Sequence, residues 1–412
     1  MSASPSEDRR RPRGRSTGAH SWGFWVAAVA FLLNMAFSAV PTPLYAIYAV
    51  RDGLNGVTIT LIYAVYAVGV IASLFFGGHV SDWIGRKAVF VPALLMSVVS
   101  AAIFILWPSL TGLFIARVIS GISVGLTTAT ATAYLSELHL GARPGVPGRR
   151  AQIIAIAANL GGIGVGPLIA GVLAQYAPDP LRLPYIVFGV AITVLAILVA
   201  LSPETTLIPS PVPRYRPQRV AVPKGARGTF FGATAAGLAS FAVFGTFNSL
   251  VPSFLVGSMH ETSHAVAGVV AFATFAAGGS AQIVLSKWDT RSMLRRGIPI
   301  VTVGLALFAA GMWIPSVWVF VAGGIVTGVG VGLVFRAAMV TVGTSALPEA
   351  RAEVLAGFFL GAYIGLSVPV IGLEIATLYW PARDVMLVFI VLVLAALAGA
   401  VAAITKRRAV RG

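Results

Sequence analysis

A short segment of the chain concentrates charge and glycine between two long apolar runs. It contains Gly78, Asp82, Gly85, Arg86 and Lys87. A carboxylate beside two bases can pair with them or with charges on neighbouring helices, and the glycines let the backbone turn tightly. Partly exposed ion pairs contribute only about 0–1 kcal/mol each. The segment is therefore suited to a charged contact that forms and breaks.

Among the polar residues that interrupt the apolar runs, we interpret four as candidates for substrate or coupling contacts: Asn34, Arg117, Arg336 and Glu374. An arginine inside a membrane helix is costly unless it faces a cavity or a partner. Arg117 is therefore either a functional charge or a structural one bonded to backbone carbonyls. Glu374 is flanked by apolar residues. It is either a carboxyl that carries protons or one that lies at the lipid–water interface.

The composition indicates that these residues are carried by membrane helices. Of the 412 residues, 58 % are apolar and 10 % are charged, whereas a soluble domain carries about 25 % charged residues. A bilayer crossing takes about 20 apolar residues, and backbone amides in lipid must be satisfied within their own segment. Twelve runs meet this length, near residues 22–49, 58–79, 88–107, 111–136, 151–176, 183–201, 229–256, 265–286, 298–314, 317–342, 354–378 and 382–405.

The basic residues predict how the chain is oriented, because cytoplasmic loops carry an excess of Lys and Arg. With both termini in the cytoplasm, all but five of the 29 Lys and Arg fall in cytoplasmic tails and loops. The exceptions are Arg51, Arg182 and Arg383 outside, and Arg117 and Arg336 within helices. Topology thus explains the net charge of +16. We expect a multi-pass protein of the cell membrane that contacts lipid and binds no nucleic acid.

The twelve runs fall into two groups of six, separated by a basic, Pro-rich linker that cannot form a core. The predicted segments are a disordered basic tail (1–21), a first six-helix bundle (22–202), a cytoplasmic linker (203–228), a second bundle (229–405) and a short tail (406–412).

The two halves also resemble each other in sequence. The glycine-rich stretch at 121–126 recurs at 328–333, an offset of 207 residues, and the same offset carries Asp82 onto Asp289. Ser292 replaces the second glycine of the charged segment, so the second copy is degenerate. Two related halves with a substrate site between them are typical of secondary transporters.

The charged segment resembles the loop between the second and third helices of major facilitator superfamily transporters. That motif reads glycine, any residue, aliphatic, small, aspartate, two residues, glycine and two bases. The matching residues are Gly78, Val80, Ser81, Asp82, Gly85, Arg86 and Lys87. Trp83 stands where a base is commoner. The resemblance implies an all-α fold of two pseudo-symmetric six-helix bundles, in which Asp82 helps to close the cytoplasmic side.

Other parts of the chain resemble further superfamily motifs. Arg117, followed four residues later by Gly121, resembles the fourth-helix motif, whose arginine is implicated in proton coupling; Ser120 replaces the usual glutamine. Glu137 and Glu204 fit superfamily loop patterns, as charges near the cytoplasmic side.

The fifth predicted span resembles the motif of the antiporter, or efflux, branch of the superfamily. The matching residues are Gly162, Gly166, Pro167 and Gly171, with Ala170 in place of a further glycine. This resemblance favours export over import. The alternative is a generic face of small residues for helix packing.

These patterns lead to a functional hypothesis: proton-coupled efflux of small hydrophobic or amphipathic compounds by alternating access, with protons as the coupling ion. The alternative is a proton symporter or facilitator that imports a sugar or an organic anion; a membrane sensor or scaffold would have no use for a gate. The chain has no cysteine, and we find no nucleophile–base set or metal-ligand cluster. We therefore expect no enzymatic activity and no cofactor, and a monomeric transporter.

Overall fold

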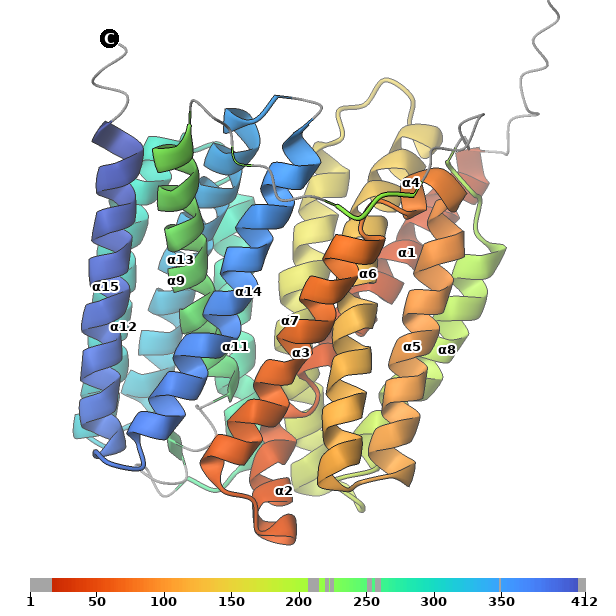
Figure 1. Cartoon of the computed structure of the whole chain (residues 1–412). Coiled ribbons are helices and arrows are strands. Elements are labelled where there is room, and N and C mark those ends of the chain that lie inside the picture. The colour runs from red at the N-terminus through yellow and green to blue at the C-terminus, as the bar shows by residue number, and fades with distance from the viewer. Residues whose placement is uncertain are drawn as a thin grey trace, which may run out of the picture.

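The computed structural model describes residues 17–206, 215–218, 222, 226–249, 254–255, 261–347 and 350–406. These residues form helices and no strand, and twelve helices are long and apolar enough to cross a membrane. Figure 1 shows them side by side in two groups. The prediction of an all-α membrane protein with twelve transmembrane helices is confirmed.

The helices divide between the two halves of the chain. The first half contains α1 (Thr17–Ala39), η1 (Thr42–Leu44), α2 (Tyr45–Asp52), α3 (Gly56–Gly77), α4 (Ser81–Ile84), α5 (Arg86–Leu106), α6 (Leu110–Ala142), α7 (Arg149–Tyr176) and α8 (Leu183–Leu201). The second half contains α9 (Arg227–Ser249), α11 (His264–Val284), α12 (Thr290–Trp313), α13 (Val317–Ser345), α14 (Arg351–Ala376) and α15 (Ala382–Lys406).

Each half has its own core of buried apolar side chains. The halves meet mainly where α7 packs against α11 and α3 packs against α14. We call these two contacts the inter-half interface. In lipid, helices associate through close packing rather than through the hydrophobic effect, so small residues matter at these contacts.

The internal repeat is visible in how the glycines pack. A methyl group on Gly121 of α6 would overlap the carbonyl oxygen of Tyr66 in α3. A methyl group on Gly328 of α13 would overlap the carbonyl oxygen of Thr274 in α11 in the same way. The repeated stretch therefore makes the same helix-to-helix contact in both halves.

Several helix ends differ from the sequence-based prediction. Helix α1 begins at Thr17, inside the segment expected to be a tail, and it ends before Pro41 and the short helix η1. Helix α12 begins at Thr290 rather than near 298, because the side chain of Asp289 accepts hydrogen bonds from the first backbone amides. Polar turns extend these helices beyond the apolar run that marks a membrane crossing. Residues 1–16 and 407–412 lie outside the described residues.

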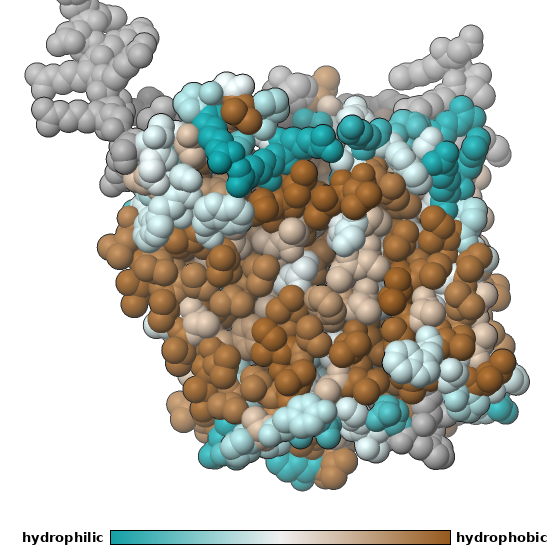
Figure 2. All heavy atoms as spheres, turned by 180° about the vertical axis from the view of Figure 1, so that it is seen from behind, coloured by the Kyte–Doolittle hydropathy of each residue, from teal (hydrophilic) through white to brown (hydrophobic). Residues whose placement is uncertain are grey.

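The surface matches that of a membrane-spanning protein. Figure 2 shows a broad apolar band between two polar rims. We call the rim that carries the 78–85 segment the motif end and the opposite rim, which carries the loops at 53–55 and 377–381, the far end. The described chain starts and finishes at the motif end (Figure 1).

Candidate functional site

Arg86 is the centre of a charged cluster at the motif end. The residue is 8 % exposed. One Nη atom pairs with the carboxylate of Asp82, four residues earlier, and the other lies 2.6 Å from Oε1 of Glu137 in α6. The predicted contact of the motif carboxylate is therefore with Arg86, which in turn binds the end of α6.

Glu204, which follows α8, completes this cluster. Its carboxylate accepts hydrogen bonds from the backbone N–H groups of Arg86 and Lys87, each at 3.0 Å. Burial alone would raise the pKa of Glu204, but these bonds and those from the amides of Thr205 and Thr206 outweigh burial and lower the pKa. Glu204 is thus a charged cap on the first turn of α5.

Gly85 makes this capping geometry possible. Its φ is +109°, where residues with a side chain are rarely found. A methyl group there would also lie 3.0 Å from a carboxylate oxygen of Glu204. The second glycine of the motif is therefore required by the backbone turn and by the carboxylate beside it.

The described part of the linker packs on the same segment. The ring of Tyr215 stacks on His79 at 6.0 Å between centroids, and Trp83 meets His79 edge-on at 4.7 Å. The backbone N–H of Gln218 donates to the backbone carbonyl of Phe75 at 2.9 Å. The tryptophan that departs from the superfamily motif thus belongs to an aromatic contact with the linker.

The second copy of the motif has a different structure. Asp289 is exposed, and hydrogen bonds from the Ser292 side chain and from the backbone amides of Ser292 and Arg291 lower its pKa. It caps α12 instead of pairing with a base. This agrees with the degenerate sequence of the second copy.

The glycines of the antiporter-like pattern lie on two faces of α7. Methyl groups on Gly162 and Gly166 would run into the backbone of α1, at Leu32 and Ala36. A methyl group on Gly171 would instead overlap the carbonyl oxygen of His264 in α11, in the other half. Helix α7 is therefore packed tightly on both sides, and one side is the inter-half interface.

Pro167 lies at the same crossing of α7 and α11. A methyl group on Gly268 of α11 would overlap the Pro167 carbonyl oxygen. Proline provides no N–H to the helix, so this turn of α7 is held by one hydrogen bond fewer where it touches the second half.

Arg117 lies inside the first half and is 2 % exposed. Its Nη1 donates to the carbonyl of Ser38 at 2.7 Å and its Nη2 to the carbonyl of Tyr63 at 3.4 Å. The guanidinium lies over the ring of Tyr66, 4.6 Å from the centroid. These carbonyl contacts are those expected for a structural arginine, but Nε has no hydrogen-bond partner in the described structure.

Asn34 is fully buried within the first half. Its side-chain amide donates to Ser123 at 3.1 Å and to Thr127 at 3.0 Å, both in α6. These bonds tie α1 to α6 within the first half. The role of Asn34 in coupling stays a prediction.

A buried asparagine that the sequence analysis did not single out bridges the two halves near the far end. Asn248 of α9 accepts a hydrogen bond from the hydroxyl of Thr42 at 3.0 Å. Its side chain also hydrogen bonds to Tyr63 of α3. An amide within an otherwise apolar run was the only signal that could have identified it.

Glu374 reaches across the interface at the far end. A methyl group on Gly56 would overlap the Glu374 carboxylate and come within 2.8 Å of its Cδ. Gly56 is the first residue of α3, and free amides at a helix N-terminus favour a nearby negative charge. A carboxylate of the second half therefore lies against the N-terminus of a helix of the first half.

Arg336 lies towards the motif end, away from Arg117. Its guanidinium donates to the backbone carbonyl of Gln282 in α11, and it lies within electrostatic reach of Arg149 on α7. Arg149 donates across the halves to Ser286 at 3.2 Å. Arg117 and Asn34 thus both lie in the contact between α1 and α6, whereas Arg336 and Glu374 lie elsewhere. No contact in the described structure joins all four predicted candidates into one site.

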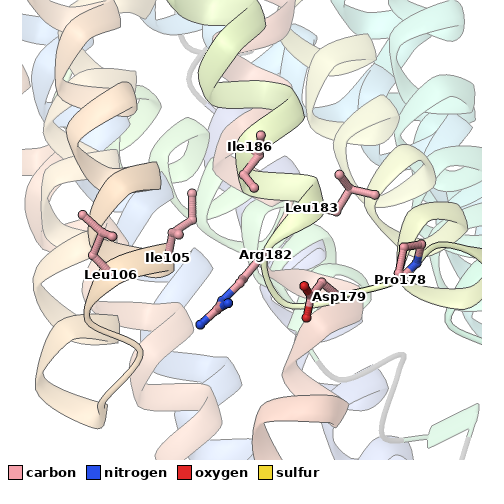
Figure 3. Close-up of a pocket in the computed structure, with 7 residues that line it drawn as sticks. All are labelled: Ile105, Leu106, Pro178, Asp179, Arg182, Leu183 and Ile186. Atoms are coloured by element: carbon pink, nitrogen blue, oxygen red, sulfur yellow. The ribbon is translucent and has the colours of Figure 1, made fainter.

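A cavity of about 450 Å³ opens at the far end between the end of α5 and the start of α8. Figure 3 shows Arg182 and Asp179 at its edge with Ile105 and Ile186 on the walls. It lies within the first half, away from the inter-half interface. No group of three or more potential metal ligands occurs among the described residues.

Comparison with known proteins supports one family. The sequence profile of the Major Facilitator Superfamily matches residues 26–295, which is more than half of the chain. The chain belongs to the Major Facilitator Superfamily. It is therefore a membrane transporter rather than an enzyme, with the fold that the charged motif predicted.

Individual relatives are distant. An MFS-type transporter of Methanocaldococcus jannaschii is 28 % identical over 151 residues, a match that spans 37 % of this chain and 37 % of that relative. The nucleoside transporter NupG superimposes with a TM-score of 0.71 at 12 % identity, over 93 % of this chain and 99 % of that one. A bacterial homologue of the human lysosomal transporter Spinster, in an inward-facing and unoccupied conformation, gives 0.69 at 15 %, over 94 % and 98 %. These structures share the fold.

Proposed function

We propose that this MFS transporter exports small hydrophobic or amphipathic compounds in exchange for protons. The observation that carries the proposal is the α7 contact. The antiporter-like glycines pack α7 against α1 on one side and against α11 of the other half on the other. Because α7 is packed closely on both sides, a movement of one half relative to the other must also change the packing of α7 in the first bundle.

The polar contacts between the halves support alternating access. The buried or partly buried hydrogen bonds that join the halves in the described residues, such as Thr42 to Asn248 and Ser367 to Ala64, lie nearer the far end. This conformation is held closed at the far end. If the motif end faces the cytoplasm, it corresponds to a state closed to the outside.

Glu374 supplies the proton-coupled element of the proposal. When the far end is closed, Glu374 is partly buried, and burial favours the protonated carboxyl more than the nearby helix N-terminus favours the charged one. A proton taken up from outside would therefore promote closure of the far end and be carried inward. We propose that the protein works in this way as a monomer in the cell membrane, with both termini in the cytoplasm.

Everted membrane vesicles test this function. A proton gradient is imposed, and neutral, anionic and cationic lipophilic dyes are followed together with internal pH. We expect dye accumulation coupled to proton release, lost in Asp82→Asn and made independent of the proton gradient in Glu374→Gln. If no dye moves with the gradient, export is wrong, and sugars and carboxylates become the substrates to test for import.

A further inference from the structure

Arg117 is a buried cation that no described carboxylate neutralises. The ion pairs of the described chain involve Arg51, Arg86 and Arg383, and Arg117 bonds only to backbone carbonyls. Burying a charge without a counter-charge is unfavourable. Ring faces and carbonyl dipoles compensate in part, but neither carries the full negative charge that would neutralise the guanidinium.

A second unpartnered donor lies within electrostatic reach of this cation. The hydroxyl of Tyr45 is buried and has no hydrogen-bond partner in the described structure, and the same holds for Nε of Arg117. The two side chains interact electrostatically. Buried polar groups are almost always hydrogen bonded, so two unpaired donors within electrostatic reach of each other favour a shared acceptor.

The cluster lies one side-chain layer from the inter-half interface. Arg117 rests on Tyr63 and Tyr66. Tyr63 hydrogen bonds to Asn248 of the second half, and Tyr363 of α14 packs against the core of the first half near the same tyrosines. Separation of the halves at the far end would remove this cover from the arginine.

We propose that Arg117 and Tyr45 bind the anionic group of the transported substrate, which is an amphipathic organic anion such as an aromatic carboxylate. This proposal rests on the transport function above and specifies its substrate class. A guanidinium can donate two hydrogen bonds to one carboxylate, and the tyrosine hydroxyl adds a third. The aromatic rings around them suit an apolar body, because small-molecule sites combine apolar walls with a few placed polar groups.

The test compares ligands that share a shape but differ in charge. Binding of 1-naphthoate, 1-naphthamide and 1-naphthylmethylammonium to the purified full chain in phosphatidylcholine nanodiscs is measured by calorimetry. We expect the carboxylate to bind at least about tenfold more tightly than the amide, and the cation to bind most weakly, since hydrogen bonds to charged groups are the strong ones.

Substitutions test whether Arg117 and Tyr45 cause the preference for the carboxylate. Arg117→Gln should abolish the preference for the carboxylate, and Tyr45→Phe should reduce it by about two- to tenfold. The matched control is Tyr48→Phe, one turn along α2, whose hydroxyl pairs with Tyr185 at 3.3 Å; it should leave the preference unchanged. Tyr45→Phe keeps the ring, so it provides the test even if Arg117→Gln does not fold.

Three results would overturn the proposal. The first is equal affinity for the three probes, and the second is a preference for the carboxylate that survives both substitutions. The third is loss of that preference when phosphatidylglycerol is added, which would assign the anion site to a lipid phosphate. Failure of the transport proposal is distinguishable. If only the transport proposal is wrong, naphthoate binds at Arg117 but no dye moves with the proton gradient. If only the anion site is wrong, neutral dyes are transported but the carboxylate does not bind.

Discussion

At the scale of single residues, Glu374 and Gly56 form a close contact between the halves. The carboxylate can lie against the first turn of α3 because Gly56 has no side chain. Neither residue belongs to a superfamily motif that the sequence analysis recognised. The contact joins a titratable group to a helix terminus across the interface that must open.

Replacing Gly56 by alanine separates the carboxylate from the helix. The new methyl group would occupy the position of the carboxylate, and the flexible Glu374 side chain would move aside. We expect gradient-dependent transport to fall towards the level of Glu374→Gln, with thermal stability lowered by only about 1 kcal/mol or less, the usual worth of a charge at a helix end. The control is Gly372→Ala on α14, where a methyl group meets nothing within 4 Å. Undiminished transport in Gly56→Ala would contradict the role of this contact.

The hydrogen bonds of Glu204 at the motif end predict that the stability of the folded protein depends on pH. Its pKa is lower in the folded chain than the ordinary glutamate value. The stabilisation is therefore present above about pH 4.3, the ordinary unfolded value, and is lost as pH falls through the folded pKa. Thermal melting of the purified protein between pH 3 and 7 should show this acid-side loss. Glu204→Gln should melt at a lower temperature at pH 7 and lose less on acidification; an identical acid-side slope in both would contradict the assignment.

At the scale of elements, α7 is one of the helices that set how the halves are spaced. Its small residues contact both α1 and α11. Substitutions that add volume should therefore have different effects on the two faces of α7. The face towards α1 supports the first bundle, whereas the face towards α11 is the surface that must slide or part during transport.

Alanine substitutions on α7 distinguish the two faces. Gly166→Ala places a methyl group against the backbone of Ala36 and should destabilise the protein by about 1–3 kcal/mol, as overpacking does. Gly171→Ala presses on His264 of the other half and should change transport rate more than melting temperature. Gly161→Ala is the matched control, because a methyl group there meets nothing within 4 Å. Equal melting temperatures for the Gly166 and Gly161 variants would refute this packing.

At the scale of the whole molecule, much of the architecture could be predicted from the sequence. Apolar length gave the twelve crossings, and the 207-residue repeat gave the two halves. Helix ends were less accurate, since polar turns such as the one capped by Asp289 extend a helix beyond its apolar run.

The candidate site was predicted only in part. Arg86, Glu137 and Glu204 were each recognised, but their contact depends on how helices distant in the chain pack together. Asn34 looked like Asn248 in sequence, as an amide within an apolar run. Tertiary packing placed Asn34 inside one bundle and Asn248 between the two, which no local pattern can distinguish.

The orientation of the chain in the membrane is directly measurable. The protein has no cysteine, so single cysteines report their own location. We expect Arg383→Cys, at the far end, to react with a membrane-impermeant maleimide added to intact cells. Lys287→Cys, exposed at the motif end, should react only after the cells are opened. Labelling of Lys287→Cys alone in intact cells would reverse the proposed orientation.

The central claim is that the far end opens during transport, and one crosslink tests it most directly. Thr42 and Asn248 meet across the halves at 3.0 Å, so Thr42→Cys and Asn248→Cys together allow a disulfide or a short thiol crosslink to hold the far end closed. We predict that the double variant crosslinks readily, that transport in everted vesicles then stops, and that reduction restores it, while each single variant is unaffected by oxidation. Transport at an undiminished rate by fully crosslinked protein would contradict alternating access at this interface.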